Sequence, residues 1–102
     1  MRISTGALKA DGTTLNPGSG DWTASRTAKG TYAITFTVPH PNTPVVLCGA
    51  NGDAGSASSD NVFSAYDAES TGFNAVSEDV AGNPSPGYAA QDAAFSFIAI
   101  SA

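Results

Sequence analysis

Few side chains in this sequence could take part in chemistry, and His40 is its only histidine. A Ser-His-Asp or Cys-His catalytic set needs its histidine beside a nucleophile and an orienting group. His40 lies between Pro39 and Pro41, in a segment that we expect to be a solvent-exposed loop. Cys48 follows three apolar residues, and burial raises the pKa of a thiol and makes it inert. The sequence therefore predicts no catalytic residue, no enzyme activity and no cofactor.

Carboxylates outnumber cations, but their spacing is not that of metal ligands. Loops that bind Ca²⁺ bring several oxygen ligands together at short spacing, as in Asp-x-Asp-x-Asp patterns, and no such pattern occurs here. Most aspartates lie in or beside expected loops: Asp53, Asp60, Asp67, Asp79 and Asp92. We interpret them as solvated loop residues and predict no metal site, with an ion on a symmetry axis as the alternative.

Two expected loops carry residue types that can bind carbohydrate. Sugar sites stack an aromatic ring on the apolar face of the sugar, while amides and carboxylates bind its hydroxyls. Tyr88 lies in a Pro- and Gly-rich loop with Asn83, although plain anchoring of that loop is the alternative. Arg26 could bind an acidic sugar or pair with Asp21 or Glu78. The predicted ligand-binding residues are Arg26, Asp60, Asn61, Asp79, Asn83 and Tyr88.

Strands must position these residues, because alternation of apolar and polar residues recurs along the chain between Gly, Pro and Asn. We expect strands at 2–8, 21–26, 31–38, 45–48, 61–68, 73–77 and 93–101, and loops at 11–20, 49–60 and 79–92. In 31–38, one face carries Tyr32, Ile34, Phe36 and Val38. Trp22 fits core packing and a platform at a loop edge equally well.

Two strands are apolar on both sides. The run at 45–48 is continuous, which is typical of a strand buried on both faces. The segment 93–101 places Phe95, Phe97 and Ala99 opposite Ser96, Ile98 and Ile100, so we expect a central strand. Six or seven such strands predict an all-β antiparallel sandwich.

The composition gives this sandwich a thin core. Only 18 of the 102 residues are Ile, Leu, Val or Phe, and Ala supplies much of the 41% hydrophobic content. A chain of this length forms one domain, which we place at 1–102. Because each Ala removes little apolar surface from water, we expect the chain to gain burial from identical copies.

The charge of −5 excludes several partner classes. Only Arg2, Lys9, Arg26 and Lys29 are positive, too few to neutralise a row of phosphates, so we predict no nucleic-acid partner. No stretch is apolar for the length of a membrane span, which predicts no membrane insertion, and the first residues lack the apolar core of a signal peptide. One cysteine allows no internal disulfide.

Four segments follow one another along the chain: Arg-Ile-Ser-Thr-Gly at 2–6, Ile-Thr-Phe at 34–36 with Pro-Val-Val-Leu at 44–47, Ser-Thr-Gly-Phe at 70–73 and Phe-Ser-Phe-Ile-Ala-Ile-Ser at 95–101. In these segments and their order the chain resembles the H-type lectin domain known from snail agglutinins. Gly-Thr-Tyr-x-Ile-Thr-Phe at 30–36 and Asp-x-x-Phe-x-Phe-Ile-Ala at 92–99 are also similar to domains at bacteriophage tail-fibre tips. The resemblance implies a six-stranded sandwich that forms a trimer.

The snail family's sugar ligands are not retained. Asp60 stands where that family has an arginine, and Val80 and Ala81 stand where it has a Trp-His pair. The resemblance therefore implies a fold rather than a known sugar specificity. We expect a homotrimeric tip domain, C-terminal in a longer fibrous protein on a virion tail fibre or otherwise extracellular, that binds a cell-surface glycan or receptor. The alternatives are a structural trimerisation cap without a ligand and a secreted bacterial lectin or adhesin domain.

Overall fold

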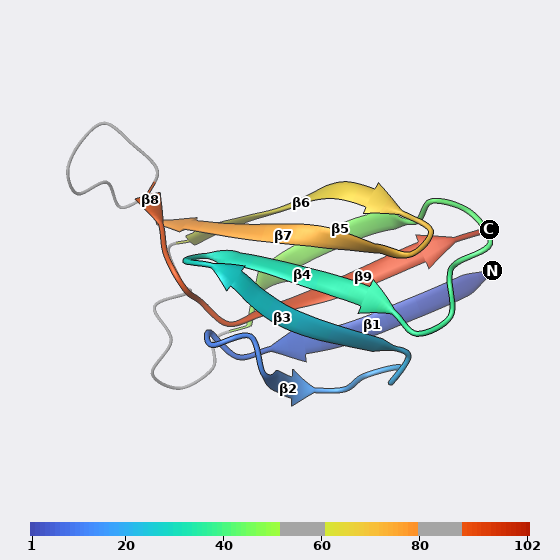
Figure 1. Cartoon of the computed structure of the whole chain (residues 1–102), viewed down its shortest axis with the longest axis horizontal. Helices are drawn as coiled ribbons and strands as arrows, with labels where there is room; N and C mark the ends of the chain where they lie inside the picture. The colour runs from blue at the N-terminus through green and yellow to red at the C-terminus, as the bar shows by residue number, and fades with distance from the viewer. Residues whose placement is uncertain (52–60, 80–88) are drawn as a thin grey trace.

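The computed structural model describes residues 1–51, 61–79 and 89–102, which form two antiparallel sheets packed face to face (Figure 1). Sheet A has the strand order β2-β1-β9-β5, and sheet B has the order β3-β4-β7-β6 with β8 beside β7. The strands are β1 (Arg2–Leu8), β2 (Thr14–Asn16), β3 (Trp22–Ala28), β4 (Thr31–Phe36), β5 (Val45–Ala50), β6 (Asn61–Glu69), β7 (Gly72–Asp79), β8 (Ala89–Ala90) and β9 (Phe95–Ser101). The predicted all-β antiparallel sandwich is confirmed.

The first and last strands form the centre of sheet A. β1 and β9 pair along their whole length, from Arg2 opposite Ser101 to Leu8 opposite Phe95. The two chain ends are therefore neighbours, at the right of Figure 1. The opposite end, here called the distal end, carries the β3–β4 turn, the start of β6, the end of β7 and β8 (Figure 1). The predicted central position of the last strand is confirmed.

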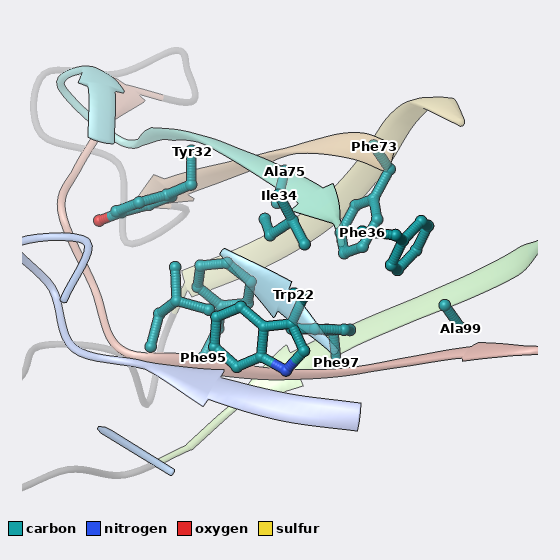
Figure 2. Close-up of a cluster of buried hydrophobic side chains, with 10 residues drawn as sticks. Trp22, Tyr32, Ile34, Phe36, Phe73, Ala75, Phe95, Phe97 and Ala99 are labelled. Atoms are coloured by element: carbon teal, nitrogen blue, oxygen red, sulfur yellow. The ribbon is translucent and has the colours of Figure 1, made fainter. Parts of the chain in front are cut away.

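The core lies between the sheets and consists mainly of aromatic rings (Figure 2). Phe97 on β9 makes edge-to-face contacts with Trp22 and Phe73, whose ring centroids lie 5.2 and 5.1 Å away. Tyr32 is fully buried, and its hydroxyl donates to the carbonyl of Ala10 at 2.7 Å. The aromatic rings and Ile34 are joined by alanines, so the interior is small in aliphatic volume, as the composition predicted.

Trp22 belongs to this core and is not a platform at a loop edge. It is buried, and its indole Nε1 donates to the carbonyls of Thr5 at 2.8 Å and Pro17 at 3.0 Å. The indole N–H thus has hydrogen-bond acceptors even though the ring is removed from water, as a buried tryptophan requires. These bonds fix β3 of sheet B to β1 of sheet A.

Several strand predictions need correction. Val45 and Leu47 on β5 are 69% and 66% exposed, so this strand is not buried on both faces within one chain. Only Val46 and Cys48 pack against the core, because sheet B covers only one face of sheet A. Val38 lies beyond the end of β4 and is exposed. The short strands β2 and β8 occur in segments that were predicted to be loops.

Candidate functional site

The predicted ligand-binding residues that the structure describes lie at the distal end. Asn61 begins β6 and is paired with Asp79 at the end of β7. The side-chain amide of Asn61 donates to the hydroxyl of Ser77 at 2.8 Å. Asp60, Asn83 and Tyr88 lie outside the described residues, so their predicted contributions stay predictions.

Arg26 near the end of β3 is held by Asp92, and the expected pairing with Asp21 or Glu78 is wrong. The Arg26 Nε lies 2.9 and 3.0 Å from the two Asp92 carboxylate oxygens, and the backbone N–H of Gly30 donates to the same carboxylate at 2.7 Å. The hydrogen bond from Arg26 lowers the pKa of Asp92 and raises that of the guanidinium. Gly30 has a φ of 69°, which glycine adopts readily at a turn.

The Arg26–Asp92 pair and the Asn61–Ser77 pair belong to one hydrogen-bonded arrangement. The backbone N–H of Ser77 donates to the Gly30 carbonyl at 2.7 Å, and the N–H of Gln91 donates to the Ser77 carbonyl at 3.1 Å. Ser77 thus connects the Arg26–Asp92 pair with Asn61. The structure therefore places Arg26, Asn61 and Asp79 at the same end of the sandwich, but it uses Arg26 and Asn61 in internal hydrogen bonds.

A second polar group surrounds His40, and the prediction that His40 is solvent-exposed is wrong. The residue is 3% exposed, because the segment after β4 folds over the ends of β1 and β9. Its Nε2 lies 2.9 Å from the Ser4 hydroxyl, and its Nδ1 lies 2.7 Å from the Ser101 hydroxyl. Ser4 also lies 2.6 Å from Asp21, which pairs with Arg2 at 3.0 Å.

The donors in this chain of contacts can be assigned by counting protons. Burial alone would raise the pKa of Asp21, but hydrogen bonds from Ser19, Ser4 and Arg2 lower it to about 2, so the carboxylate is ionised and can only accept. Ser4 must then donate its one proton to Asp21 and accept from His40 Nε2–H. The neutral imidazole therefore accepts from the Ser101 hydroxyl at Nδ1.

This arrangement is unsuited to nucleophilic catalysis. A serine nucleophile donates its proton to the histidine, and a carboxylate orients that histidine from its other nitrogen. Here the Ser4 proton is directed to Asp21, and Ser4 is fully buried. We interpret the four side chains Ser4, Asp21, His40 and Ser101 as a network at the end that carries the chain termini. It joins β1 and β9 to the residue before β3 and to the segment after β4.

The network predicts a pH dependence of stability. Burial lowers the pKa of His40 below 6.5, as does the charge of Arg2, and Asp21 only partly opposes them. As the pH falls, His40 is therefore protonated in the unfolded chain before it is protonated in the folded chain. The stability that neutral His40 contributes is complete above pH 6.5 and is lost as the pH falls from 6.5 through the lower pKa of the folded state. Asp21 contributes above pH 3.8, and its contribution is lost between 3.8 and about 2.

A His40→Gln variant tests this prediction. It should unfold with roughly 1–3 kcal/mol less free energy above pH 6.5, since a buried network loses a partner. The difference from wild type should shrink below pH 6.5, because glutamine does not titrate. Urea unfolding curves of both proteins, recorded across the pH range at the same protein concentration, measure this difference. A difference that does not change with pH would contradict a buried, neutral His40.

The remaining candidates for chemistry are weak. Cys48 is partly buried, and burial raises the pKa of its thiol to about 12, as predicted for an apolar strand. Within residues 1–51, 61–79 and 89–102, no group of three or more His, Cys, Asp and Glu side chains is placed to hold a metal ion. The same residues contain no helix long and apolar enough to cross a membrane.

Comparisons with known proteins do not assign this chain to a family: no family model, no curated protein and no solved structure matches it.

Proposed function

We propose that the chain is a self-associating host-recognition domain, of the kind found at the tips of phage tail fibres, that binds a cell-surface glycan or receptor as a homotrimer. The observation that carries this proposal is an exposed apolar surface on the outer side of sheet A. We call it the apolar face, and it consists of Ile3, Val45, Leu47, Ile98 and Ile100.

The strand register builds the apolar face in two rows. One row contains Ile3, Ile100 and Val45, and the next contains Thr5, Ile98 and Leu47. Neither row includes a charged side chain. Monomeric proteins rarely leave a contiguous apolar surface in water, so such a surface usually marks an interface.

The outer side of sheet B has the opposite character. Its rows contain Thr23 and Thr35, and then Ser25, Ala33, Asn74 and Tyr66. Hydroxyl and amide groups prefer hydration, so this side suits solvent. The asymmetry supports association through sheet A with sheet B outside, and association of this kind supplies the burial that the thin core lacks.

A trimer also suits weak individual contacts. Three copies of a shallow polar site gain avidity because binding of the second and third becomes intramolecular. The distal end brings Arg26, Asn61 and Asp79 together on one side of each copy, and in a trimer it would repeat three times. This repetition supports recognition of a surface that displays many identical glycans.

One experiment tests both parts of the proposal. Sedimentation of wild type should give a mass near three chains, and Leu47→Lys should give monomer, because a lysine would place an unpaired charge in the apolar face. Val62→Lys is the matched control, since Val62 is an exposed aliphatic residue on sheet B, 47% accessible. The control should remain trimeric.

The same proteins are then applied to a glycan array and to bacterial cells. The wild-type trimer should bind, and both the Leu47→Lys monomer and a Tyr88→Ala trimer should bind much more weakly. A compact, stable wild-type monomer would contradict the proposed association.

A structural trimerisation cap is the second candidate, and one observation favours it. Arg26 and Asn61, two of the predicted ligand-binding residues, are engaged by Asp92 and Ser77. A wild-type trimer that binds no glycan and no cell, with Tyr88→Ala indistinguishable from it, would establish the cap.

A further inference from the structure

We infer that each chain carries a binding site for a neutral saccharide on the outer side of sheet B, away from the distal end. This inference rests on the proposed function, and it assigns glycan binding to residues outside the predicted ligand-binding set. The site is a hollow of about 360 Å³ beside the turn between β6 and β7. Pockets for small ligands begin at about this size. We call it the sheet B hollow.

The floor of the sheet B hollow consists of residues with little or no side chain. Ala33 on β4 lies opposite Asn74 on β7, and Gly72 lies opposite Thr35. Ile34 and Phe73, which alternate with them, are buried in the core, so their side chains do not fill the hollow. A ring-shaped ligand can therefore approach the backbone of both strands.

The rim carries five polar side chains. They are two carboxylates, one amide and two hydroxyls: Asp67, Glu69, Asn74, Thr35 and Thr71. None of the five side chains hydrogen-bonds to another residue in the described part of the chain, so all of them can bind a ligand. In this respect the hollow differs from the distal end, where Arg26 and Asn61 already have internal partners.

A β-bulge shapes this rim. The register of β6 and β7 shifts between Tyr66 and Glu69, and Asp67 has a φ of 52°. A bulge redirects side chains relative to a regular strand, and aspartate is among the residues that tolerate a left-handed backbone. In a regular strand Asp67 and Glu69 would share the face opposite Tyr66. The bulge instead turns Ala68 toward the core, so that Asp67 and Glu69 both line the hollow.

An aromatic ring completes the set of groups. Tyr66 is 41% exposed. It precedes Asp67 in the chain and is paired with Asn74 on β7, and Asp67 and Asn74 both line the hollow. A tyrosine at the edge of a polar depression offers an apolar surface against which the C–H face of a sugar can pack. Carboxylates and amides beside it can bind the sugar hydroxyls.

The charges select the class of ligand. Two carboxylates and no cation line the hollow, in a chain of net charge −5. They accept hydrogen bonds from hydroxyl groups but repel carboxylate and phosphate, so acidic sugars are excluded. In a trimer that associates through sheet A, the three hollows would face outward on the flanks, where long host polysaccharides can reach them.

NMR titration of ¹⁵N-labelled wild-type protein tests the inference. Methyl glycosides of glucose, galactose and mannose, at millimolar concentrations, should shift the amide signals of Ala33, Gly72 and Asn74 for at least one sugar. Sialic acid should leave these signals unchanged. Asn74→Ala should weaken the binding roughly tenfold, which corresponds to the loss of one or two hydrogen bonds.

Two further variants complete the design. Asp67→Asn removes the charge but keeps a residue that tolerates the left-handed backbone, so it tests the hollow if Asn74→Ala fails to fold. Ser64→Ala, on the exposed side of β6 but outside the hollow, is the control and should bind like wild type. Unshifted hollow signals with every glycoside, or full binding by Asn74→Ala and Asp67→Asn, would overturn the inference.

The titration also separates this inference from the proposed function. Shifts confined to Gly30 and Gln91 at the distal end would overturn the hollow and leave the proposed function standing. Binding of wild type to the array and to cells tests the proposed function independently of any single glycoside.

Discussion

Replacing Phe97 with alanine should lower the free energy of unfolding by about 3–5 kcal/mol, the usual cost of removing a buried phenyl ring. Phe97 is the centre of the aromatic core, since both Trp22 and Phe73 contact its ring edge-to-face. Its neighbours Ala75 and Ala99 are too small to fill the space that the ring would leave. A large cavity should therefore remain.

Thermal unfolding measures this loss. For a domain of this length we expect the midpoint to fall by at least about 10 °C, because 1 kcal/mol corresponds to several degrees. Val62→Ala on the outer side of sheet B should change the stability by no more than about 0.5 kcal/mol. A Phe97→Ala protein as stable as this control would show that the aromatic core is not the main source of stability.

Substituting Gly6 with alanine should be strongly destabilising, although it adds only a single methyl group. A Cβ at Gly6 would lie 2.1 Å from Cζ2 of Trp22 and 2.4 Å from its Cε2. The indole cannot simply rotate away, because Thr5 and Pro17 accept its N–H and Phe97 packs against the ring. We expect a loss of roughly 2–5 kcal/mol from overpacking and from weakened hydrogen bonds.

Trp22 itself reports on this change, since it is the only tryptophan. Its fluorescence should shift to longer wavelength in Gly6→Ala as the ring becomes hydrated. Gly49→Ala is the matched control, because a Cβ at Gly49 would meet nothing within 4 Å. Equal stability of the two alanine variants would mean that β1 can move away from Trp22 at little cost.

The long strands were predictable because their signal is local. In β4 and β9 the alternation of side chains identifies both the strand and its buried face, and the structure confirms Tyr32, Ile34, Phe95 and Phe97 as core. The short strands β2 and β8 have two or three residues each, too few to show any alternation. They form only because β1 and β7 offer them partners.

The continuous apolar run of β5 carried an ambiguity that the sequence alone could not resolve. Val46 and Cys48 pack against the core, whereas Val45 and Leu47 do not. A strand buried on both sides within one chain and a strand that reserves one side for a partner have the same hydrophobic pattern. Only the exposure of Val45 and Leu47 shows that one side of β5 is not covered within the chain.

The polar sites depended on contacts between distant parts of the chain. His40 is buried by Ser4 and Ser101, which are 36 and 61 residues away, and Arg26 is bound by Asp92 at a separation of 66. No pattern within a local window contains this information, so both environments were mispredicted. The sheet B hollow was missed for a related reason, since Ala33 and Gly72 are notable only for the space they leave.

The pairing of Arg2 with Ser101 has a practical consequence for any binding measurement. A biotin or a fluorescent dye attached at either terminus would sit on one side of the molecule, far from β8 (Figure 1). Protein captured on a sensor chip through such a tag would present its Arg26–Asp92 region to the flowing sample. Capture through lysines would be less uniform, because Lys29 lies at the tip of the β3–β4 turn and would attach the domain with its distal end toward the sensor.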